Sequence, residues 1–201
     1  MAPRYLVLEE LGDALAAVQA SDRLTRIGVD GVDGAGKTLL AEEVAQLLTR
    51  RRRPAVRVSV DQFERPPGER YARGGLSPEG YYHDSFDVES FRAHVLGIDG
   101  PREVVLVADG VFLQRPELAD LWDATVWVEA ELEVAARRGA ERDVSRGWAD
   151  APGERHERYR LRFLPAQRRY IEEQRPRERA TFVLRNTDPT EPELVRQPRP
   201  R

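Results

Sequence analysis

The chain has 201 residues, a formal net charge of −3 at pH 7, and no cysteine. This composition excludes disulfides, cysteine–zinc sites and thiol nucleophiles, and the charge gives no general attraction to nucleic acid or anionic membranes. Hydrophobic residues make up 40% and charged residues 33%, as in a single globular domain. No stretch reaches the roughly 18 apolar residues of a membrane span, and the N-terminus lacks an apolar signal-peptide core. We therefore expect a cytoplasmic protein.

Helix and strand signals alternate over the first 50 residues. Apolar residues at helical spacing predict an amphipathic N-terminal helix within residues 1–22. Residues 26–30 are typical of a short buried strand, and a second apolar stripe predicts a helix soon after it. The stripe consists of Leu40, Val44, Leu47 and Leu48.

The segment between that strand and helix is Gly-Val-Asp-Gly-Ala-Gly-Lys-Thr, residues 31–38. It matches G-x-x-x-x-G-K-[ST], the P-loop, in which backbone N–H groups surround nucleotide phosphates. Lys37 is the only lysine beside 31 arginines, which indicates a site that needs a compact ammonium and not a planar fork. We predict an ATP site with Mg²⁺, in which Thr38 binds the metal. The predicted nucleotide-binding residues are Gly31, Asp33, Gly34, Ala35, Gly36, Lys37, Thr38 and Leu39.

Two further strands are predicted to end in acidic residues. Residues 55–60 form a strand that ends at Asp61, and residues 103–109 form a nearly continuous apolar strand that ends at Asp109. Between them, residues 62–82 contain three prolines and predict a long functional loop, and residues 88–96 predict a short helix that Asp87 caps.

The carboxyl ends of parallel strands meet at one crevice, so these acids should lie near the phosphates. Asp109 is typical of the acid that holds Mg²⁺ together with Thr38. Asp61 is suited to remove the proton of an acceptor hydroxyl. Asp30, at the start of the P-loop, is more often structural, and a capping or turn role is the alternative for the other two.

The remaining elements predict the architecture. Residues 125–128 and 181–184 are strands, residues 131–146 are a helix, and residues 154–175 are a helix kinked at Pro165. The alternation predicts an α/β P-loop NTPase fold with a five-stranded parallel sheet flanked by helices. We expect one domain over residues 1–201, with a helical lid at 137–153 and a frayed tail at 188–201.

Two sets of residues are candidates for the chemistry beside the P-loop. Arg138 and Arg142 share a helix face and could stabilise a transferring phosphoryl group, although an ordinary charged face is nearly as good an explanation. The aromatic segment at Tyr81 and Tyr82, with Asp84, could surround a small substrate or simply pack as a loop.

At this point the chain resembles the uridine kinase/phosphoribulokinase group of P-loop kinases, over most of residues 24–187. The resemblance rests on ordered segments: Asp61-Gln62-Phe63 for Asp-x-Phe, residues 84–87 for Asp-Ala-Phe-Asp, Asp109-Gly110 for Glu-Gly, and arginines at 137–138 and 142 for the lid. It implies that Asp61 is the base, that Arg138 and Arg142 act from the lid, and that Phe63, Tyr81, Tyr82 and Asp84 contact the acceptor.

The departures from the family pattern concern the acceptor. Tyr81 and Tyr82 replace the family's substrate-binding aspartate and histidine, and Asp109 replaces a glutamate. We expect a nucleoside-like acceptor, with pantothenate, a sugar, a sugar acid or nicotinamide riboside as alternatives. A nucleotide-binding switch without a small substrate and a degenerate paralogue also stay open. Partners are expected to be small molecules, with no nucleic acid and no membrane, and a homo-oligomer is left open.

Overall fold

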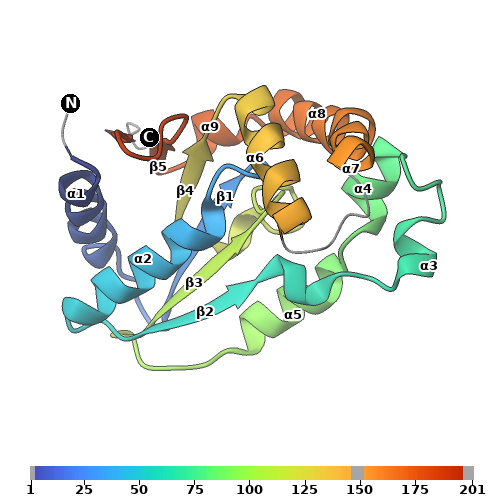
Figure 1. Cartoon of the computed structure of the whole chain (residues 1–201). Coiled ribbons are helices and arrows are strands. Elements are labelled where there is room, and N and C mark those ends of the chain that lie inside the picture. The colour runs from blue at the N-terminus through green and yellow to red at the C-terminus, as the bar shows by residue number, and fades with distance from the viewer. Residues whose placement is uncertain (1–2, 146–151, 197–201) are drawn as a thin grey trace.

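A six-stranded sheet forms the centre of the molecule (Figure 1). The structure is a computed structural model that describes residues 3–145 and 152–196. In spatial order the strands are β2 (Ala55–Ser59), β3 (Val105–Gly110), β1 (Thr25–Gly31), β4 (Ala124–Glu129), β5 (Phe182–Arg185) and β6 (Glu193–Arg196). The first five of these strands pair in parallel, each with the next, which confirms the predicted five-stranded parallel sheet.

The sixth strand is a departure from the sequence prediction. β6 pairs antiparallel with β5, from Phe182 opposite Arg196 to Arg185 opposite Glu193, within the segment that we expected to be frayed. Composition pointed to fraying because prolines flank the segment, but the exposed edge of β5 offers it unpaired backbone groups. Pairing with that edge orders residues 193–196.

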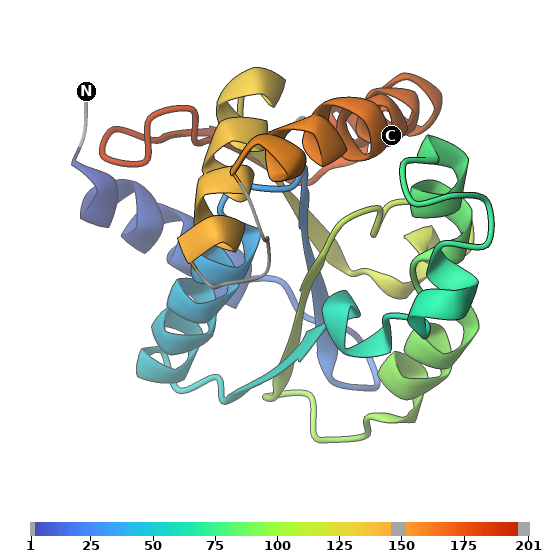
Figure 2. The ribbon, with the colours of Figure 1, turned by 45° about the vertical axis from the view of Figure 1, so that its right-hand side comes forward.

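Helices cover both faces of the sheet and the edge where its strands end (Figure 2). On one face lie α1 (Arg4–Ala16) and α2 (Lys37–Arg50), and on the other lie α3 (Pro67–Arg70), α4 (Pro78–Asp84) and α5 (Val88–Gly97). Across the end of the sheet run α6 (Leu132–Ser145), α7 (Pro152–Arg158) and α8 (Leu164–Gln174), followed by α9 (Pro176–Arg179). Short 3-10 turns span Val60–Phe63 and Ala119–Leu121.

Several predicted boundaries move in the structure. The first helix ends at Ala16, and the predicted long loop contains α3 and α4. Both short helices begin with proline, which fits the first helical turn because no N–H is needed there. We expected a kink at Pro165. The structure instead has a π-helical turn, Tyr159–Phe163, that separates α7 from α8, and Pro165 lies in the first turn of α8.

The core lies on both faces of the central strands. Every residue of β1 and β3 is buried, as expected of parallel strands covered on both sides. The predicted stripe of α2 is buried against them: Leu40, Val44, Leu47 and Leu48. On α5, Phe91 and Val95 are fully buried. These contacts fix β1 and its following loop as the rigid centre of the fold.

The register of the sheet aligns the strand ends that carry the acids. Asp109 of β3 lies opposite Val29 of β1 and opposite Ser59 of β2. The P-loop follows β1 directly, and Asp61 lies two residues beyond Ser59. Sheet pairing therefore brings the loop and both acids to one edge.

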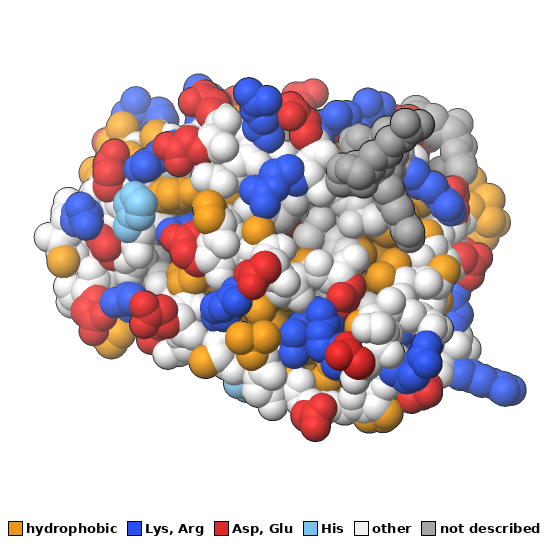
Figure 3. Space-filling model, turned by 180° about the vertical axis from the view of Figure 1, so that it is seen from behind, with side chains coloured by type: hydrophobic (Ala, Val, Ile, Leu, Met, Phe, Trp, Pro, Cys, Tyr) orange, Lys and Arg blue, Asp and Glu red, His pale blue; other side chains and the backbone are white. Residues whose placement is uncertain are grey.

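The outer surface shows no bias toward one charge on the face seen in Figure 3. Basic and acidic side chains are interspersed over the described part of that face, unlike the continuous basic surface of a nucleic-acid-binding protein. None of the helices within residues 3–145 and 152–196 has the length and apolar character needed to cross a membrane.

Candidate active site

The P-loop has a conformation that requires glycine at two positions. Gly34 has a φ of 78° and Gly36 a φ of 98°, in the left-handed region that costs glycine little. A Cβ on Gly34 would lie 1.9 Å from the carbonyl oxygen of Ala135 in α6. The loop therefore packs directly against the backbone of α6, and α2 begins at Lys37 immediately after it.

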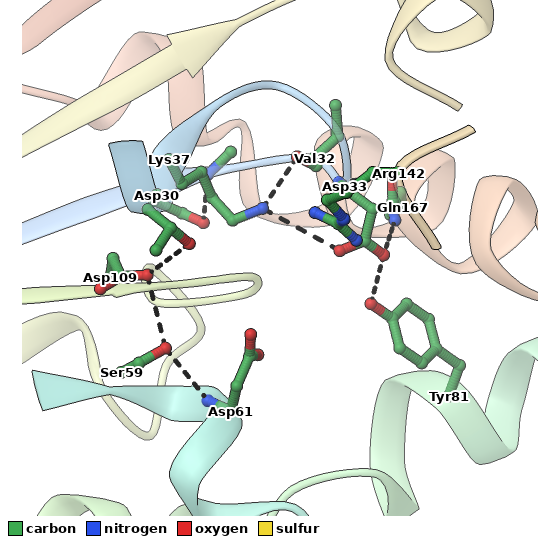
Figure 4. Close-up of polar contacts among 12 residues, drawn as sticks. Asp30, Val32, Asp33, Lys37, Ser59, Asp61, Tyr81, Asp109, Arg142 and Gln167 are labelled. Atoms are coloured by element: carbon green, nitrogen blue, oxygen red, sulfur yellow. Dashed lines mark hydrogen bonds and ion pairs between the residues drawn. The ribbon is translucent and has the colours of Figure 1, made fainter. Parts of the chain in front are cut away.

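Lys37 lies inside the curve of the loop. Its side chain is 9% exposed, and its ammonium donates to the carbonyl oxygen of Val32 at 2.8 Å and lies 4.0 Å from a carboxylate oxygen of Asp33. Figure 4 shows the ammonium between the end of β1 and Asp33. A compact ammonium confined within the loop is suited to bind phosphate oxygens.

Oxygen ligands suited to Mg²⁺ meet beside the loop. Thr38 donates a 2.9 Å hydrogen bond to one carboxylate oxygen of Asp109, whose side chain is 1% exposed. Mg²⁺ in nucleotide sites uses one or two protein oxygens and completes its shell with phosphates and water. The described residues contain no group of three or more His, Cys, Asp or Glu that could hold a metal, so a metal here would depend on nucleotide oxygens. The pair fits that role.

Sequence reasoning missed a third member of this group, Arg57 of β2. Its guanidinium donates to the other carboxylate oxygen of Asp109 at 3.1 Å and to Glu42 at 3.1 Å. Ser59 is on the same strand as Arg57, and its hydroxyl oxygen lies 3.4 Å from a carboxylate oxygen of Asp109. Side chains alternate between the two faces of a strand, so the sequence could have placed Arg57 and Ser59 on one face of β2. That they meet Asp109 also depends on β3 being the neighbouring strand, which the sequence does not show.

Two cavities open at this edge of the sheet, and they meet. The phosphate pocket, about 380 Å³, is lined by the P-loop with Glu42 and Ser59, and also by Asp61 and Arg142. The acceptor pocket, about 450 Å³, is lined by residues of α3, α4, α6 and α7–α8, and again by Asp61 and Arg142. These two side chains therefore stand at the boundary between the cavities.

Asp61 is the carboxylate best placed for proton transfer. It remains accessible to solvent, but the pocket walls replace much of its water. This desolvation raises the pKa of Asp61 to about 6, a shift that Lys37 opposes and that the carboxylates of Asp33 and Asp109 increase. Figure 4 shows its carboxylate directed into the space below Lys37. A base with a pKa near 6 is ionised at neutral pH and accepts a proton readily.

A buried carboxylate holds Arg142 at the boundary. One oxygen of Asp143 accepts from Arg142 at 2.8 and 2.9 Å, and the other accepts from Arg155 and, at 3.2 Å, from the Tyr159 hydroxyl. The Asp143 side chain is 1% exposed. Desolvation, with the neighbouring carboxylates, raises the pKa of Tyr159, so that this hydroxyl stays protonated. The cluster ties α6 to α7 and fixes the guanidinium of Arg142.

The P-loop also contacts the acceptor pocket through Asp33. One carboxylate oxygen of Asp33 accepts from the Tyr81 hydroxyl at 2.5 Å and from Gln167 at 2.7 Å. Tyr81 comes from α4 and lines the acceptor pocket, whereas Gln167 comes from α8. Figure 4 shows both side chains converging on Asp33 from opposite sides.

Asp30 has the structural role that the sequence favoured. Its carboxylate is fully buried and accepts from the N–H of Gly31 at 2.8 Å, from Gln114 at 3.2 Å, and from the Tyr170 hydroxyl. Burial raises the pKa of Asp30, while these hydrogen bonds and Lys37 lower it. The network anchors α8 to β1 and lies away from the two cavities' shared boundary.

Four of the candidates for the lid and the acceptor contacts line neither cavity: Arg138, Phe63, Tyr82 and Asp84. Arg138 donates to the carbonyls of Asn186 and Thr187 after β5, so the geometry does not support a charge-stabilising role. Phe63 packs edge-on against Phe91 of α5, with ring centroids 5.4 Å apart.

Tyr82 and Asp84 are also absent from the acceptor pocket. Tyr82 is 4% exposed and packs on Phe112, with ring centroids 5.0 Å apart and Arg115 over its face. Asp84 forms an ion pair with Arg73 at 2.6 Å on the outer surface. On α4, Tyr81 therefore faces the pocket and its neighbours do not. Residues 146–151 of the predicted lid at 137–153 lie outside the described residues.

The acceptor pocket contains residues that the sequence analysis did not single out. Most of them are basic or aromatic: Arg70, Tyr71, Phe86, Arg155, Arg158, Tyr159, Arg162 and Phe163. Arginines at positions 155, 158 and 162 follow helical spacing, which was a usable signal. In a chain with 31 arginines that signal does not stand out.

Comparison with known proteins gives structural matches only. No family model matches the sequence, and no curated protein matches it. A possible uridine kinase from Bacillus stearothermophilus is 20% identical, with a TM-score of 0.67, over 89% of this chain and 97% of that one. A candidate fructose transport system kinase from Silicibacter sp. TM1040 is 19% identical, with a TM-score of 0.67, over 82% and 94%. The chain thus has the α/β fold of uridine kinase-like P-loop kinase structures.

Proposed function

We propose that this protein is an ATP- and Mg²⁺-dependent kinase that transfers the γ-phosphoryl group to a hydroxyl of a small, nucleoside-like molecule. The observation that carries the proposal is the junction of two cavities at Asp61 and Arg142. One cavity contains a complete P-loop and the other is large enough for a small substrate. Phosphoryl transfer requires donor and acceptor oxygens in line across such a junction.

The residues at the junction have distinct roles in this proposal. Asp61 accepts the proton of the acceptor hydroxyl as that oxygen attacks the γ-phosphorus. Lys37 and Arg142 face the oxygens of the transferring group from two sides and stabilise their charge. Thr38 and Asp109 would hold Mg²⁺, which would neutralise charge on the nucleotide phosphates. Arg57 fixes the orientation of Asp109 through its second oxygen.

Two features support the nucleoside-like acceptor and neither identifies it. The fold is shared with a possible uridine kinase and a candidate fructose transport system kinase, so both a nucleoside and a sugar are reasonable acceptors. Aromatic rings line the pocket at Tyr71, Tyr81 and Phe163 and offer faces for a base or a sugar ring. Pantothenate and nicotinamide riboside stay as alternatives.

The test is ADP release from Mg²⁺-ATP with a panel of nucleosides, sugars, sugar acids and pantothenate. Lys37→Ala is the blank, because removing the ammonium should reduce turnover to background by removing charge stabilisation at the phosphates. Turnover that only one acceptor class stimulates, and that Lys37→Ala abolishes, supports the proposal. Near-wild-type turnover in Lys37→Ala would contradict the mechanism.

A nucleotide-binding switch is the main alternative from another functional class. A switch would hydrolyse ATP slowly, and no hydroxyl compound would stimulate that hydrolysis. The acceptor pocket favours the kinase, because a switch has no need of a second cavity that shares Asp61 with the phosphate site.

A further inference from the structure

The charge of the acceptor pocket is unusual for a neutral substrate. Five of its lining residues are arginines: Arg70, Arg142, Arg155, Arg158 and Arg162. Asp143 serves two of them, at positions 142 and 155, and Glu64 pairs with the one at position 70. Among the described residues, no carboxylate forms an ion pair with the arginines at 158 and 162. Four carboxylates also line the pocket, at positions 33, 61, 64 and 143, so its walls carry one more arginine than acid. The arginines at 158 and 162, which have no such partner, carry the excess.

Arg162 is the most confined of these cations. It is 2% exposed, and each terminal nitrogen of its guanidinium makes two hydrogen bonds within the protein. One donates to the carbonyls of Gly74 and Ser77 at 3.3 and 3.1 Å, and the other donates to the carbonyl of Arg70 at 3.0 Å and to the Ser85 hydroxyl at 3.2 Å. Burial lowers the pKa of Arg162, and the nearby positive charges of Arg158 and Arg70 lower it further. A buried cation that is bonded only to neutral groups is costly unless an anion joins it.

Three of the arginines converge on one aromatic ring. The guanidinium carbons of Arg162, Arg70 and Arg158 lie 5.0, 5.5 and 5.6 Å from the ring centroid of Tyr71. Like charges so close repel one another, and one tyrosine ring offsets only part of that repulsion. None of these four residues lines the phosphate pocket, so the cluster lies in the part of the acceptor pocket away from the P-loop.

We propose that the acceptor carries an anionic group, a phosphate ester or a carboxylate, and that Arg70 and Arg158 bind this group, while the buried charge of Arg162 beside them adds to the attraction. The inference rests on the proposed function, since it names the substrate class of the same pocket. Arginine binds both kinds of oxyanion through paired N–H groups. The anion then lies at one end of the pocket, and the hydroxyl to be phosphorylated lies at the other, beside Asp61.

The first test compares acceptors in matched pairs that differ in one anionic group. Suitable pairs are ribose with ribose 5-phosphate, fructose with fructose 6-phosphate, and glucitol with gluconate. We expect kcat/KM for the anionic member to exceed that of its neutral partner by roughly 10- to 100-fold, as charged hydrogen bonds to a buried site would give. The phosphate and carboxylate pairs show which anion fits. Equal or better turnover of the neutral members would overturn the inference.

The second test uses a variant with a matched control. Arg158 has no ion-pair partner among the described residues, so Arg158→Gln should leave the fold intact. It should raise KM for the anionic acceptor by roughly 10-fold or more and leave KM for ATP unchanged. Arg160→Gln is the control, because Arg160 is an exposed residue of the same segment and does not line the pocket. An increase in KM for ATP instead would assign Arg158 to the nucleotide and contradict the inference.

A binding measurement separates this inference from the proposed function. With Mg²⁺-ADP bound at saturating concentration, inorganic phosphate should raise the Tm of the wild type, and Arg158→Gln should require a roughly 10-fold higher phosphate concentration. If no acceptor is phosphorylated but this shift depends on Arg158, the anion site stands and the kinase proposal fails. If phosphate gives no shift, or gives the same shift in Arg158→Gln, the anion site is refuted.

Discussion

Replacing Asp61 with asparagine tests the central step of the proposed mechanism. Asparagine keeps the size of the side chain but cannot accept the proton of the acceptor hydroxyl. General-base catalysis contributes roughly 10²- to 10⁴-fold in enzymes, so kcat should fall by about that factor. The affinity for ATP, measured by fluorescence titration or calorimetry, should change little, because Asp61 lies at the boundary and is not part of the P-loop.

The raised pKa of Asp61 gives this prediction a pH dependence. With a pKa of about 6, roughly one Asp61 in ten is ionised at pH 5 and nine in ten at pH 7. The kcat/KM of the wild type, which reports the pKa of the free enzyme, should therefore increase about tenfold over this range, and the residual rate of Asp61→Asn should not follow the same curve. The assay is ADP release at substrate concentrations below KM across pH 5–8.

Stability offers an independent measurement that needs no acceptor. The folded pKa of Asp61 lies above its unfolded value of 3.8, so the protonated form is favoured in the folded protein. The resulting stabilisation is fully present below about pH 4 and is lost as pH rises through 6. Asp61→Asn should thus have a higher Tm than the wild type at pH 8 and a similar Tm near pH 4. A lower Tm at pH 8, or a rate profile shared by both proteins, would refute this account of Asp61.

Two further substitutions test how α6 is held over the P-loop. Asp143→Asn removes a buried charge that pairs with two arginines, one of them 43% exposed. We expect the free energy of unfolding to fall by about 3 kcal/mol and Tm to fall by roughly 6–12 °C. The control is Asp120→Asn, in an exposed ion pair with Arg92, which should not change Tm measurably. Gly34→Ala places a side chain at a left-handed φ, with its Cβ 1.9 Å from the backbone of α6. It should lower the free energy of unfolding by about 2–5 kcal/mol. The control is Gly75→Ala, where a Cβ would meet open space, and it should leave stability unchanged. Thermal unfolding checks both, and equal effects of variant and control would contradict either explanation.

The parts of the site that were predictable from the sequence are those that local pattern determines. The P-loop is a contiguous octet, and the acids Asp61 and Asp109 follow strands that hydrophobic runs reveal. Parallel pairing then brings them to one edge without further information. For the same reason the five parallel strands were predictable, since each depends on residues close together in the chain.

The parts that were not predictable depend on distant partners. Phe63 and Tyr82 have the aromatic character of substrate contacts, but Phe63 is half-buried against Phe91 and Tyr82 is buried against Phe112. Arg138 lies one helical turn from Arg142, yet the carbonyls after β5 bind its guanidinium. The charge of the acceptor pocket arises from α3 and α7–α8, which are far apart in sequence. Local pattern carries no record of such convergence.

Asp33 belongs to both binding surfaces, and this has a thermodynamic consequence. Its backbone is part of the P-loop, with its N–H donating to Gln167 of α8 at 3.3 Å, while its carboxylate accepts from Tyr81 of the acceptor pocket and from the same Gln167. A nucleotide that shifts Asp33 on binding therefore shifts the wall against which the acceptor rests. Linkage requires the coupling to be reciprocal: whatever factor ATP applies to acceptor affinity, the acceptor applies to ATP affinity. The two substrates should thus be measured together, because the affinity of each is a property of the pair.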